Sequence, residues 1–308
     1  MEPLLTIAIP TYNRCTFLER SLYYLLGQIN DAGGKVEIII SDNCSSDATT
    51  EVVNKYIQQG LVISYIKNET NIGVDKNIVQ CYERAKGRFV WIMGDDDYLV
   101  PGSLPQIIEI LTQNPTVGIC YIRSKWMLNP DEYTPAPVSK LNWSEDTNNS
   151  AFLGKVHYWI TFITGNIVNK AVVTDLNINS SKFLDTNLVQ LGWTIPALFH
   201  AEKNIIIDNE LLICQGNNTG GYSLVKVFAH NFNRIMNDFV KQGYNKQLKT
   251  IVNTNLLDSF FVYYYNNVTV FKMNSVVFLY EMGKSFWRYP IFWRKYVLNK
   301  KWALSLFS

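Results

Sequence analysis

The stretch Phe89-Val90-Trp91-Ile92-Met93-Gly94-Asp95-Asp96-Asp97 places three consecutive carboxylates directly after an apolar run. A run of this kind, without a charge, predicts a buried strand. Successive side chains of extended backbone point to opposite faces, so Asp95 and Asp97 share one face and Asp96 takes the other. Two carboxylates about 4 Å apart repel each other by roughly 4 kcal/mol at an effective dielectric constant of about 20. A cation with oxygen ligands, Mg²⁺ or Mn²⁺, removes this repulsion. The alternative is a solvated acidic turn that caps the helix after Pro101.

Strand and helix signals alternate over the first 121 residues. Apolar runs predict strands at 4–10, 36–40, 61–66, 88–93 and 117–121, and helical spacing of apolar residues predicts helices at 17–28, 48–59, 74–85 and 103–112. Single helices between strands imply βαβ units with right-handed crossovers, and therefore a mainly parallel sheet. Ligands of such sheets bind at the carboxyl ends of the strands. We therefore expect one shared site in the polar stretches after Ile9, Ile40, Ile66 and Met93.

Composition excludes several classes of protein. Of the 308 residues, 47% are hydrophobic and 18% are charged, which is enough apolar material for a large core. A net charge of +2 is too small for bulk electrostatic binding of nucleic acid. The five cysteines are scattered and form no Cys-x-x-Cys pair, as is typical of a reducing compartment. We find no secretory signal and no long uncharged apolar run, and so expect a soluble or peripheral protein.

The segment after the first predicted strand, Pro10-Thr11-Tyr12-Asn13-Arg14, differs from a dinucleotide-binding loop. Such a loop needs several glycines, and no glycine occurs between Met1 and Leu26. This argues against a Rossmann-type NAD site. Tyr12 can instead stack on a base, and Arg14 can offer positive charge to a phosphate.

Two further loops carry polar residues at strand ends. Asp42 follows the second strand, where its carboxylate can accept a hydrogen bond from a nucleobase N–H; the alternative is an Asx-turn. Asp47 fits the cap of the next helix. The loop Asn71-Ile72-Gly73-Val74-Asp75-Lys76-Asn77 opens the third helix. Its backbone N–H groups and Lys76 suit an anionic diphosphate, and an ordinary turn and helix cap is the alternative.

Together these segments resemble the family 2 glycosyltransferases, whose GT-A fold is a nucleotide-sugar-binding α/β domain. The matching motifs, in the family's order, are Pro10-Thr11-Tyr12-Asn13-Arg14, Ser41-Asp42-Asn43 with Ser45 and Asp47, Asn71-x-Gly73-x-x-x-Asn77 and Trp91-Ile92-Met93-Gly94-Asp95-Asp96-Asp97. The resemblance implies an inverting enzyme.

The resemblance also implies roles for individual residues. Asp42 would bind the base, and Lys76 and Asn77 the ribose–diphosphate side. Asp95 and Asp97 would take the DxD ribose and metal positions, with Mn²⁺ or Mg²⁺ as the cofactor. The full set expected at the nucleotide sugar is Pro10, Thr11, Tyr12, Asn13, Arg14, Asp42, Asn71, Gly73, Lys76, Asn77, Asp95 and Asp96, and the expected metal ligands are Asp97 and Asp95.

The expected catalytic base departs from the family pattern. Gly165-Asn166-Ile167-Val168-Asn169-Lys170 looks like the strand on the acceptor side, yet the Glu-Asp pair that often follows is missing. Phe183-Leu184-Asp185-Thr186-Asn187-Leu188-Val189-Gln190-Leu191 is more similar to the O-antigen branch that contains the abequosyltransferases. Asp185 is the expected base and Glu202 the reserve. The alternative for Asp185 is a helix cap.

The C-terminal segment is basic and aromatic. Residues 281–308 carry a net charge of +5, and the rest of the chain carries −3. Aromatic and basic residues interleave over 278–307, including Phe286, Trp287, Tyr289, Phe292, Trp293, Tyr296 and Trp302. This pattern is typical of a helix in a membrane interface. The alternative is a helical pair that packs on its own domain, and Tyr263-Tyr264-Tyr265 fits such packing or an oligomer contact.

The predicted fold is α/β, with a mainly parallel GT-A-type sheet, flanking helices and a helical, aromatic-rich C-terminal region. We expect a GT-A domain over 1–222, in which 1–121 binds the nucleotide sugar and 122–222 the acceptor, and a helical region over 223–308. Residues 129–150, rich in Pro, Asn, Ser and Asp, predict a surface loop.

The predicted function is the metal-dependent transfer of a hexosyl or deoxyhexosyl group to a lipid-linked saccharide, in O-antigen or capsule synthesis. The donor would be a UDP-, dTDP-, CDP- or GDP-sugar, and the enzyme would lie in the cytoplasm at the inner face of the membrane. One alternative is a nucleotidyltransferase, although Pro10–Arg14 is not the Gly-rich, basic loop that such an enzyme needs after the first strand. The other is a noncatalytic nucleotide-sugar-binding or scaffold protein, which the missing Glu-Asp pair favours.

Overall fold

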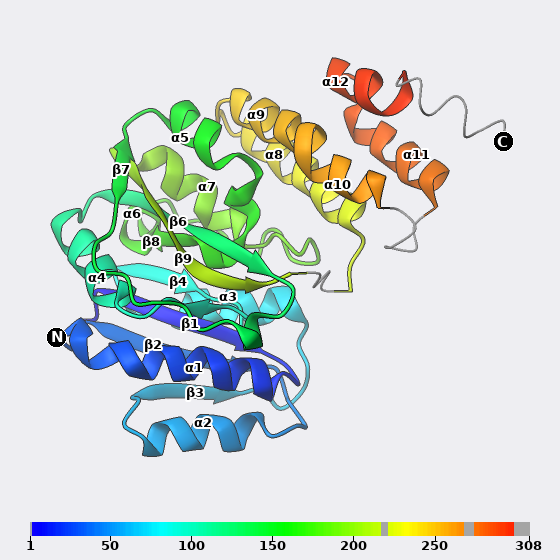
Figure 1. Ribbon diagram of the computed structural model, residues 1–308. Helices are drawn as coiled ribbons and strands as arrows, with labels where there is room; N and C mark the ends of the chain where they lie inside the picture. Colours follow the sequence, from blue (N-terminus) through cyan, green and yellow to red (C-terminus); the bar gives the residue numbers. More distant parts are fainter. Residues whose placement is uncertain (1, 217–220, 268–273, 299–308) are drawn as a thin grey trace. The chain divides into compact units, whose positions relative to one another are not determined.

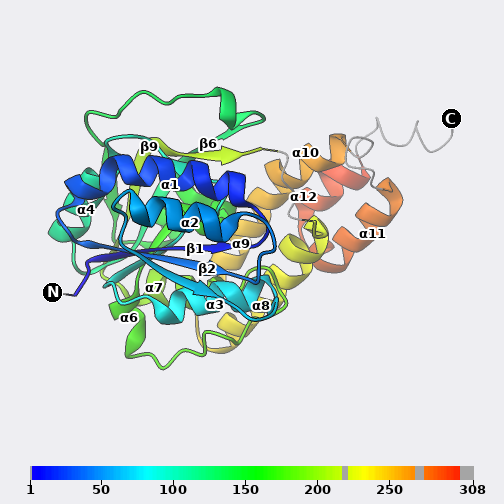
Figure 2. The same cartoon turned by 90° about the horizontal axis from the view of Figure 1, so that it is seen from below.

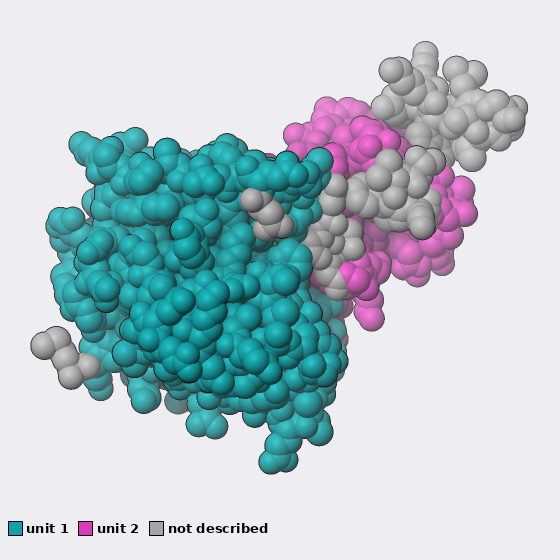
Figure 3. All heavy atoms as spheres, turned by 60° about the horizontal axis from the view of Figure 1, so that its bottom comes forward, with its two compact units in different colours: residues 1–152, 160–218 teal, residues 153–159, 219–308 magenta. Residues whose placement is uncertain are grey.

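The structure, a computed structural model, describes residues 2–216, 221–267 and 274–298. The chain divides into two compact units (Figure 3). Unit 1 comprises Met1–Phe152 with Ile160–Asn218, and unit 2 comprises Leu153–Trp159 with Thr219–Ser308. Unit 1 is α/β and unit 2 is helical (Figure 1).

The first half of unit 1 is the predicted parallel sheet. Its strands are β1 (Leu5–Thr11), β2 (Val36–Asp42), β3 (Ile63–Lys67) and β4 (Phe89–Ile92). They run parallel in the order β3-β2-β1-β4, with Ile7 paired to Ile38 on one side and to Trp91 on the other. The expected strand positions and the parallel arrangement are confirmed.

Helices cover both faces of this sheet. They are α1 (Cys15–Ile29), η1 (Asn30–Ala32), α2 (Thr49–Gln58), α3 (Val74–Arg84) and α4 (Ser103–Gln113). Figure 2 shows α1, α2 and α4 over one face and α3 over the other. Leu22 of α1 and Val53 of α2 are fully buried against the strands, as their helical spacing predicts.

The second half of unit 1 adds antiparallel strands. β8 (Asn166–Asn169) lies between β4 and β6 (Val117–Met127) and is antiparallel to both. β9 (Lys203–Gln215) runs parallel to β6, and β5 (Tyr98–Leu99) and β7 (Trp143–Asp146) pair antiparallel with β9. β6 extends six residues beyond its predicted end at 121, because the polar, half-buried residues Arg123, Ser124 and Lys125 interrupt its apolar run. The predicted loop at 129–150 contains β7.

The remaining helices of the middle segment are short. They are η2 (Pro130–Glu132), α5 (Asn149–Val156), η3 (His157–Thr161), η4 (Ile163–Gly165), α6 (Lys170–Thr174) and α7 (Leu191–His200). α7 is buried from Leu191 to Leu198 and lies on the same face of the sheet as α3 (Figure 2).

Unit 2 is built from helices around an aromatic core. They are η5 (Val225–Asn231), α8 (Phe232–Lys241), α9 (Gln247–Asn255), η6 (Leu256–Phe260), α10 (Phe261–Asn266), α11 (Ser275–Phe286), α12 (Pro290–Phe292) and η7 (Trp293–Val297). The rings of Phe261 and Phe286 are buried 5.6 Å apart. The helical, aromatic C-terminal region is thus confirmed. None of the helices in the described residues is long and apolar enough to span a membrane.

Candidate active site

The acidic triplet lies in the turn after β4, at the carboxyl edge of the parallel sheet. Asp95 and Asp97 are buried, at 5% and 4% exposure, and Asp96 is half-buried. Thr164 Oγ1 donates to Asp97 Oδ2 at 2.6 Å and accepts from the backbone N–H of Gly94 at 2.9 Å. A Cβ atom at Gly94 would lie only 3.0 Å from Asp97 Oδ2. Glycine thus gives the turn room to fold back onto its own carboxylates.

The loop after β1 holds the triplet from the other side. Thr11 Oγ1 donates to Asp95 Oδ2 at 2.8 Å. Arg14 bridges two carboxylates, with Nη2 at 2.7 Å from Asp96 Oδ2 and Nε at 3.3 Å from Asp95 Oδ1. In the structure, the positive charge of Arg14 therefore faces the acidic triplet, whereas the sequence analysis expected it to face a phosphate.

Burial shapes the electrostatics of these carboxyls. It raises the pKa of Asp95 to about 7, against the opposing effect of Arg14. Burial, followed by repulsion from Asp96, raises the pKa of Asp97 as well. Holding both groups ionised at neutral pH is therefore costly, and a cation beside them would reduce the cost.

The donor atoms of the triplet are carboxylate oxygens, which suit a hard divalent cation. Among the described residues, however, no group of three or more His, Cys, Asp or Glu is arranged to hold a metal ion. A cation here would have Asp95 and Asp97 as protein ligands, and would need oxygens of a bound ligand or of water for its other positions.

The loop after β2 forms the turn that was the alternative for Asp42. Asp42 is fully buried; its Oδ1 accepts from Ser45 N at 2.7 Å and its Oδ2 from Tyr65 Oη at 2.6 Å. Burial and this hydrogen bond raise the pKa of Tyr65. Both oxygens of Asp42 are thus used inside the protein, and the structure does not present them to a nucleobase.

Side-chain hydrogen bonds tie the three loops after β1, β2 and β3 together. Asn13 N donates to Ser45 Oγ at 2.8 Å. Asn43 Nδ2 donates to Asn71 Oδ1 at 2.8 Å, and Asn43 Oδ1 accepts from Ile72 N at 2.9 Å. The expected convergence of the strand ends is what the structure shows. Asn43, which joins the loops after β2 and β3, was not among the residues to which the sequence analysis gave a role. Only its place in the Ser41-Asp42-Asn43 motif pointed to it.

The two residues expected at the diphosphate, Lys76 and Asn77, lie next to each other in α3, one exposed and the other buried. Gly73, which precedes α3, has a positive φ of 89°, a backbone conformation that favours glycine. Lys76 is exposed and lines a cavity of about 290 Å³ with Ser181 and Leu184. Asn77 is buried, and its amide accepts from Ser41 Oγ at 2.6 Å and donates to Ser41 O at 2.9 Å. Asn77 therefore braces β2 against α3.

The structure also places the residues expected at the base and at the acceptor: Tyr12, Asp185 and Glu202. Tyr12 is 45% exposed beside Thr11 at the carboxyl edge, so its ring is accessible for stacking. Asp185 is exposed in the loop between α6 and α7, and the next two backbone N–H groups bind Asp75 in the first turn of α3. This contact brings Asp185 to the carboxyl edge. Glu202 precedes Lys203, which pairs with Val117 at the start of β6.

The start of β6 belongs to the amino edge of the sheet, because β6 and β4 point the same way across the antiparallel β8. Glu202 therefore lies at the opposite edge from the acidic triplet. The structure thus holds the Asp185 loop at the first turn of α3 and leaves Glu202 at the opposite edge of the sheet.

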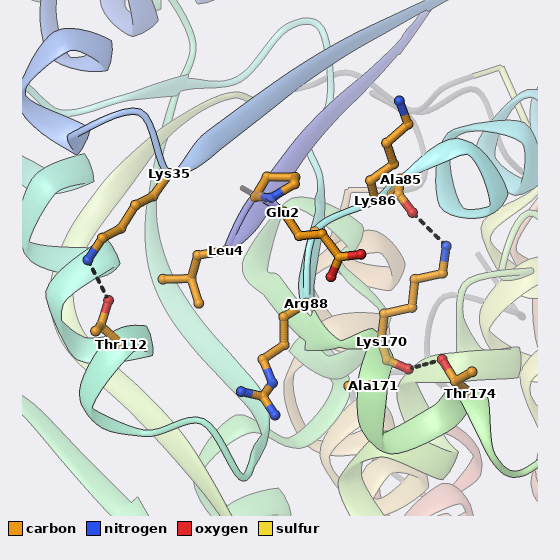
Figure 4. Close-up of a pocket in the computed structure, with 12 residues that line it drawn as sticks. Glu2, Leu4, Lys35, Ala85, Lys86, Arg88, Thr112, Lys170, Ala171 and Thr174 are labelled. Atoms are coloured by element: carbon orange, nitrogen blue, oxygen red, sulfur yellow. Dashed lines mark hydrogen bonds between the residues drawn. The ribbon is translucent and has the colours of Figure 1, made fainter.

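A cavity of about 750 Å³ also opens at the amino edge (Figure 4). The basic side chains that line it point apart, and two of them form hydrogen bonds. Lys35 Nζ donates to Thr112 Oγ1 at 3.3 Å, and Lys170 Nζ donates to the Ala85 carbonyl oxygen at 2.7 Å (Figure 4). Lys170 thereby caps the C-terminal end of α3. Because the cavity lies opposite the triplet, we assign it no part in the site.

Several characterised proteins are similar to this chain. It is 35% identical over 121 residues to the abequosyltransferase RfbV of Salmonella typhimurium, an alignment that covers 38% of this chain and 35% of that protein. It is 33% identical over 133 residues to the GalNAc(5)-diNAcBac-PP-undecaprenol beta-1,3-glucosyltransferase of Campylobacter jejuni, covering 42% of each. The chain thus spans about two fifths of the length of the curated relatives it matches.

Solved structures share the fold. TarS 1–349 of S. aureus in complex with UDP-GlcNAc superposes with a TM-score of 0.65 at 19% identity, covering 92% of this chain and 79% of that one. The mannosyltransferase PcManGT of Pyrobaculum calidifontis, in complex with GDP-Man and Mn²⁺, has a TM-score of 0.57 at 14% identity, covering 95% and 82%. The family model for glycosyl transferase family 2 matches residues 6–167, more than half of the chain. This chain belongs to glycosyl transferase family 2.

Proposed function

We propose that this protein transfers a sugar from a nucleoside-diphosphate sugar to a hydroxyl group of a saccharide. The observation that carries the proposal is the pair of buried carboxylates, Asp95 and Asp97, at the converging carboxyl ends of a family 2 sheet. Two proteins of the same fold were solved with UDP-GlcNAc and with GDP-Man, which supports a nucleotide sugar as the ligand here.

In this proposal, the loops after β1 and β3 bind the donor. Tyr12 stacks on the base through its exposed ring. The backbone around Gly73, at the start of α3, faces the diphosphate. Asp95 and Asp97 would hold Mn²⁺ or Mg²⁺, which when bound neutralises charge on the departing diphosphate. Asp42 acts indirectly, because it fixes Tyr65 and the turn before Asp47.

Asp185 takes the proton of the acceptor. The acceptor oxygen forms a bond to the anomeric carbon while the bond from that carbon to the diphosphate oxygen breaks, and its electron pair leaves with the diphosphate. The acceptor proton passes to the Asp185 carboxylate. Attack from the face opposite the diphosphate inverts the anomeric centre. The exposed position of Asp185 leaves it accessible to an incoming saccharide.

The proposed acceptor is a saccharide on a lipid carrier, in the synthesis of a surface polysaccharide such as O-antigen or capsule, at the inner face of the cell membrane. The Campylobacter relative acts on an undecaprenol-linked saccharide, as its name states. Unit 2 offers the membrane contact: Trp287 and Trp293 are 55% and 43% exposed, beside the exposed cations Arg288 and Arg294. These residues fit the headgroup region of an anionic membrane.

Release of nucleoside diphosphate tests this function. The protein is incubated with Mn²⁺ and a panel of UDP-, dTDP-, CDP- and GDP-sugars, with and without lipid-linked saccharides. We expect nucleoside diphosphate from one donor, faster with acceptor, and none with Asp97→Asn. Asp31→Asn, an exposed carboxylate of η1, is the matched control. Release of sugar 1-phosphate, the leaving group when the nucleotidyl group itself is transferred, would instead identify a nucleotidyltransferase, and donor binding without turnover a noncatalytic binding protein.

The assignment of the base has its own prediction. We expect Asp185→Asn to lower the kcat of transfer by about 100-fold or more, the usual contribution of a general base, with little change in the donor KM. Glu202→Gln should leave kcat within about twofold, because Glu202 lies at the amino edge. Loss of activity in Glu202→Gln, with full activity in Asp185→Asn, would contradict the assignment.

A further inference from the structure

One side chain of α3, that of Asp75, holds the loop that carries Asp185 through hydrogen bonds. Asp75 lies in the first turn of α3 and is only 4% exposed. Its Oδ2 accepts from Thr186 N at 2.8 Å and from Asn187 N at 3.0 Å. One carboxylate oxygen therefore holds two consecutive backbone N–H groups of a loop more than a hundred residues later in the chain.

The anchored loop has an uncommon backbone. Asp185 and Asn187 have φ angles of 62° and 55°, in the left-handed region, on either side of the fully buried Thr186. Inside the loop, Thr186 Oγ1 donates to Phe183 O at 2.6 Å and accepts from Leu188 N at 3.0 Å. Such conformations cost energy outside glycine and persist where the surroundings hold them.

Burial and hydrogen bonding act in opposite directions on the pKa of Asp75. Burial raises the pKa of Asp75, whereas the N–H groups of Asn187 and Thr186 act in the opposite direction. An ionised acceptor makes stronger hydrogen bonds to backbone N–H groups than a neutral one. Asp75 also lies two residues after Gly73, in the turn to which we assign the diphosphate. The loop to which we assign the donor and the loop that carries Asp185 thus meet at Asp75.

We infer that Asp75 is a positioning residue for sugar transfer: it sets the backbone that places Asp185 at the carboxyl edge. The inference deepens the proposed function and rests on it. Asp75 touches neither donor nor acceptor in this scheme, and it acts through Asp185.

Steady-state kinetics of three variants test the inference. Asp75→Ala leaves two N–H groups without an acceptor, so we expect kcat to fall by about 10- to 100-fold while the donor KM stays within about twofold. Asp75→Asn should restore kcat to within about fivefold of the wild type, because its amide oxygen accepts the same N–H groups. Asp175→Ala, an exposed carboxylate after α6, should match the wild type. Equal kcat in Asp75→Ala and the wild type would overturn the inference.

Hydrogen exchange gives a readout that does not depend on activity. In the wild type, the amides of Thr186 and Asn187 should exchange slowly. In Asp75→Ala they should exchange at least about tenfold faster, while the amides of α7 keep their protection. Unchanged exchange at both amides would overturn the inference and leave the proposed function standing. If the wild type transfers no sugar, the proposed function fails, and the catalytic role of Asp75 falls with it even if the exchange result holds.

Discussion

Asp97 keeps its carboxylate inside the protein with Thr164 Oγ1 as a donor and Asp96 as a close like charge. Its folded pKa lies above the value of about 3.9 expected in the unfolded chain. The folded state therefore retains a proton that the unfolded state has already lost, and its stability falls as the pH rises from about 4 through the folded pKa. Asp95, with a pKa of about 7, acts in the same direction.

Because ionisation of Asp97 lowers the stability of the folded state, replacing its carboxylate by a neutral amide should stabilise the protein. Without metal at pH 8, we expect Asp97→Asn to melt at least about 3 °C above the wild type, because the amide keeps an acceptor for Thr164 and removes the buried charge. The gain should vanish near pH 4. Thermal melts at both pH values measure it, with Asp31→Asn as control. A lower melting temperature for Asp97→Asn at pH 8 would contradict the electrostatic account.

Residue types and spacing predicted which residues meet at the carboxyl edge better than they predicted which atoms face a ligand. The acidic triplet, the Tyr12 loop and the start of α3 all lie at the carboxyl edge of the parallel strands, as their places after β4, β1 and β3 predict. Asp42 and Asn77 turned inward because their partners, Tyr65 and Ser41, lie on strands or loops whose register the sequence does not show. Arg14 likewise meets Asp96 only through the fold.

At the scale of elements, β6 packs closely against α7. A Cβ atom at Gly118 of β6 would clash with the Ala197 carbonyl oxygen and lie 2.5 Å from Ala201 Cβ. We expect Gly118→Ala to lower the free energy of unfolding by about 3 kcal/mol. Gly192→Ala, within α7 itself, meets only Phe183 at 3.5 Å and should raise it by about 0.5 to 1 kcal/mol. Urea titrations of both variants compare them directly, and equal stabilities would contradict the packing described here.

The elements of the first half were predictable because each strand is a mainly apolar run and each helix has one apolar face. The second half was not. β9 reads as two short apolar runs, since Asp208, Asn209 and Glu210 interrupt it, and its pairing with β6 shifts register near Arg123. The antiparallel insertion of β8 between β4 and β6 is a long-range arrangement, which local periodicity does not encode.

At the scale of the whole molecule, the aromatic C-terminal segment is partly buried and partly exposed. Phe286, Phe292 and Tyr296 are buried within unit 2, so part of the segment packs internally. Trp287 and Trp293 are exposed. Trp302, Lys300 and Lys301 lie outside the described residues. The packed half explains a stable helical unit, and the exposed half is the proposed membrane surface.

Sedimentation with anionic vesicles tests that surface. We expect the wild type to pellet at low salt and to be released at about 1 M salt, where charges are screened beyond roughly 3 Å. Replacing Trp287 and Trp293 by Ser should lower the bound fraction several-fold, because the two rings no longer enter the interface. Tyr23→Ser with Trp143→Ser removes two exposed aromatics of unit 1 and is the matched control. Equal pelleting of both double variants would argue against a membrane role for this segment.

The central claim is that the carboxyl edge of the parallel sheet binds a nucleoside diphosphate together with a divalent cation. Anomalous scattering from crystals grown with Mn²⁺ and a nucleoside diphosphate tests it most directly. The account predicts a manganese peak within bonding distance of Asp97, with the diphosphate beside the start of α3. A nucleotide bound at the amino-edge cavity near Arg88 and Lys170, with the acidic triplet bare of metal, would contradict it.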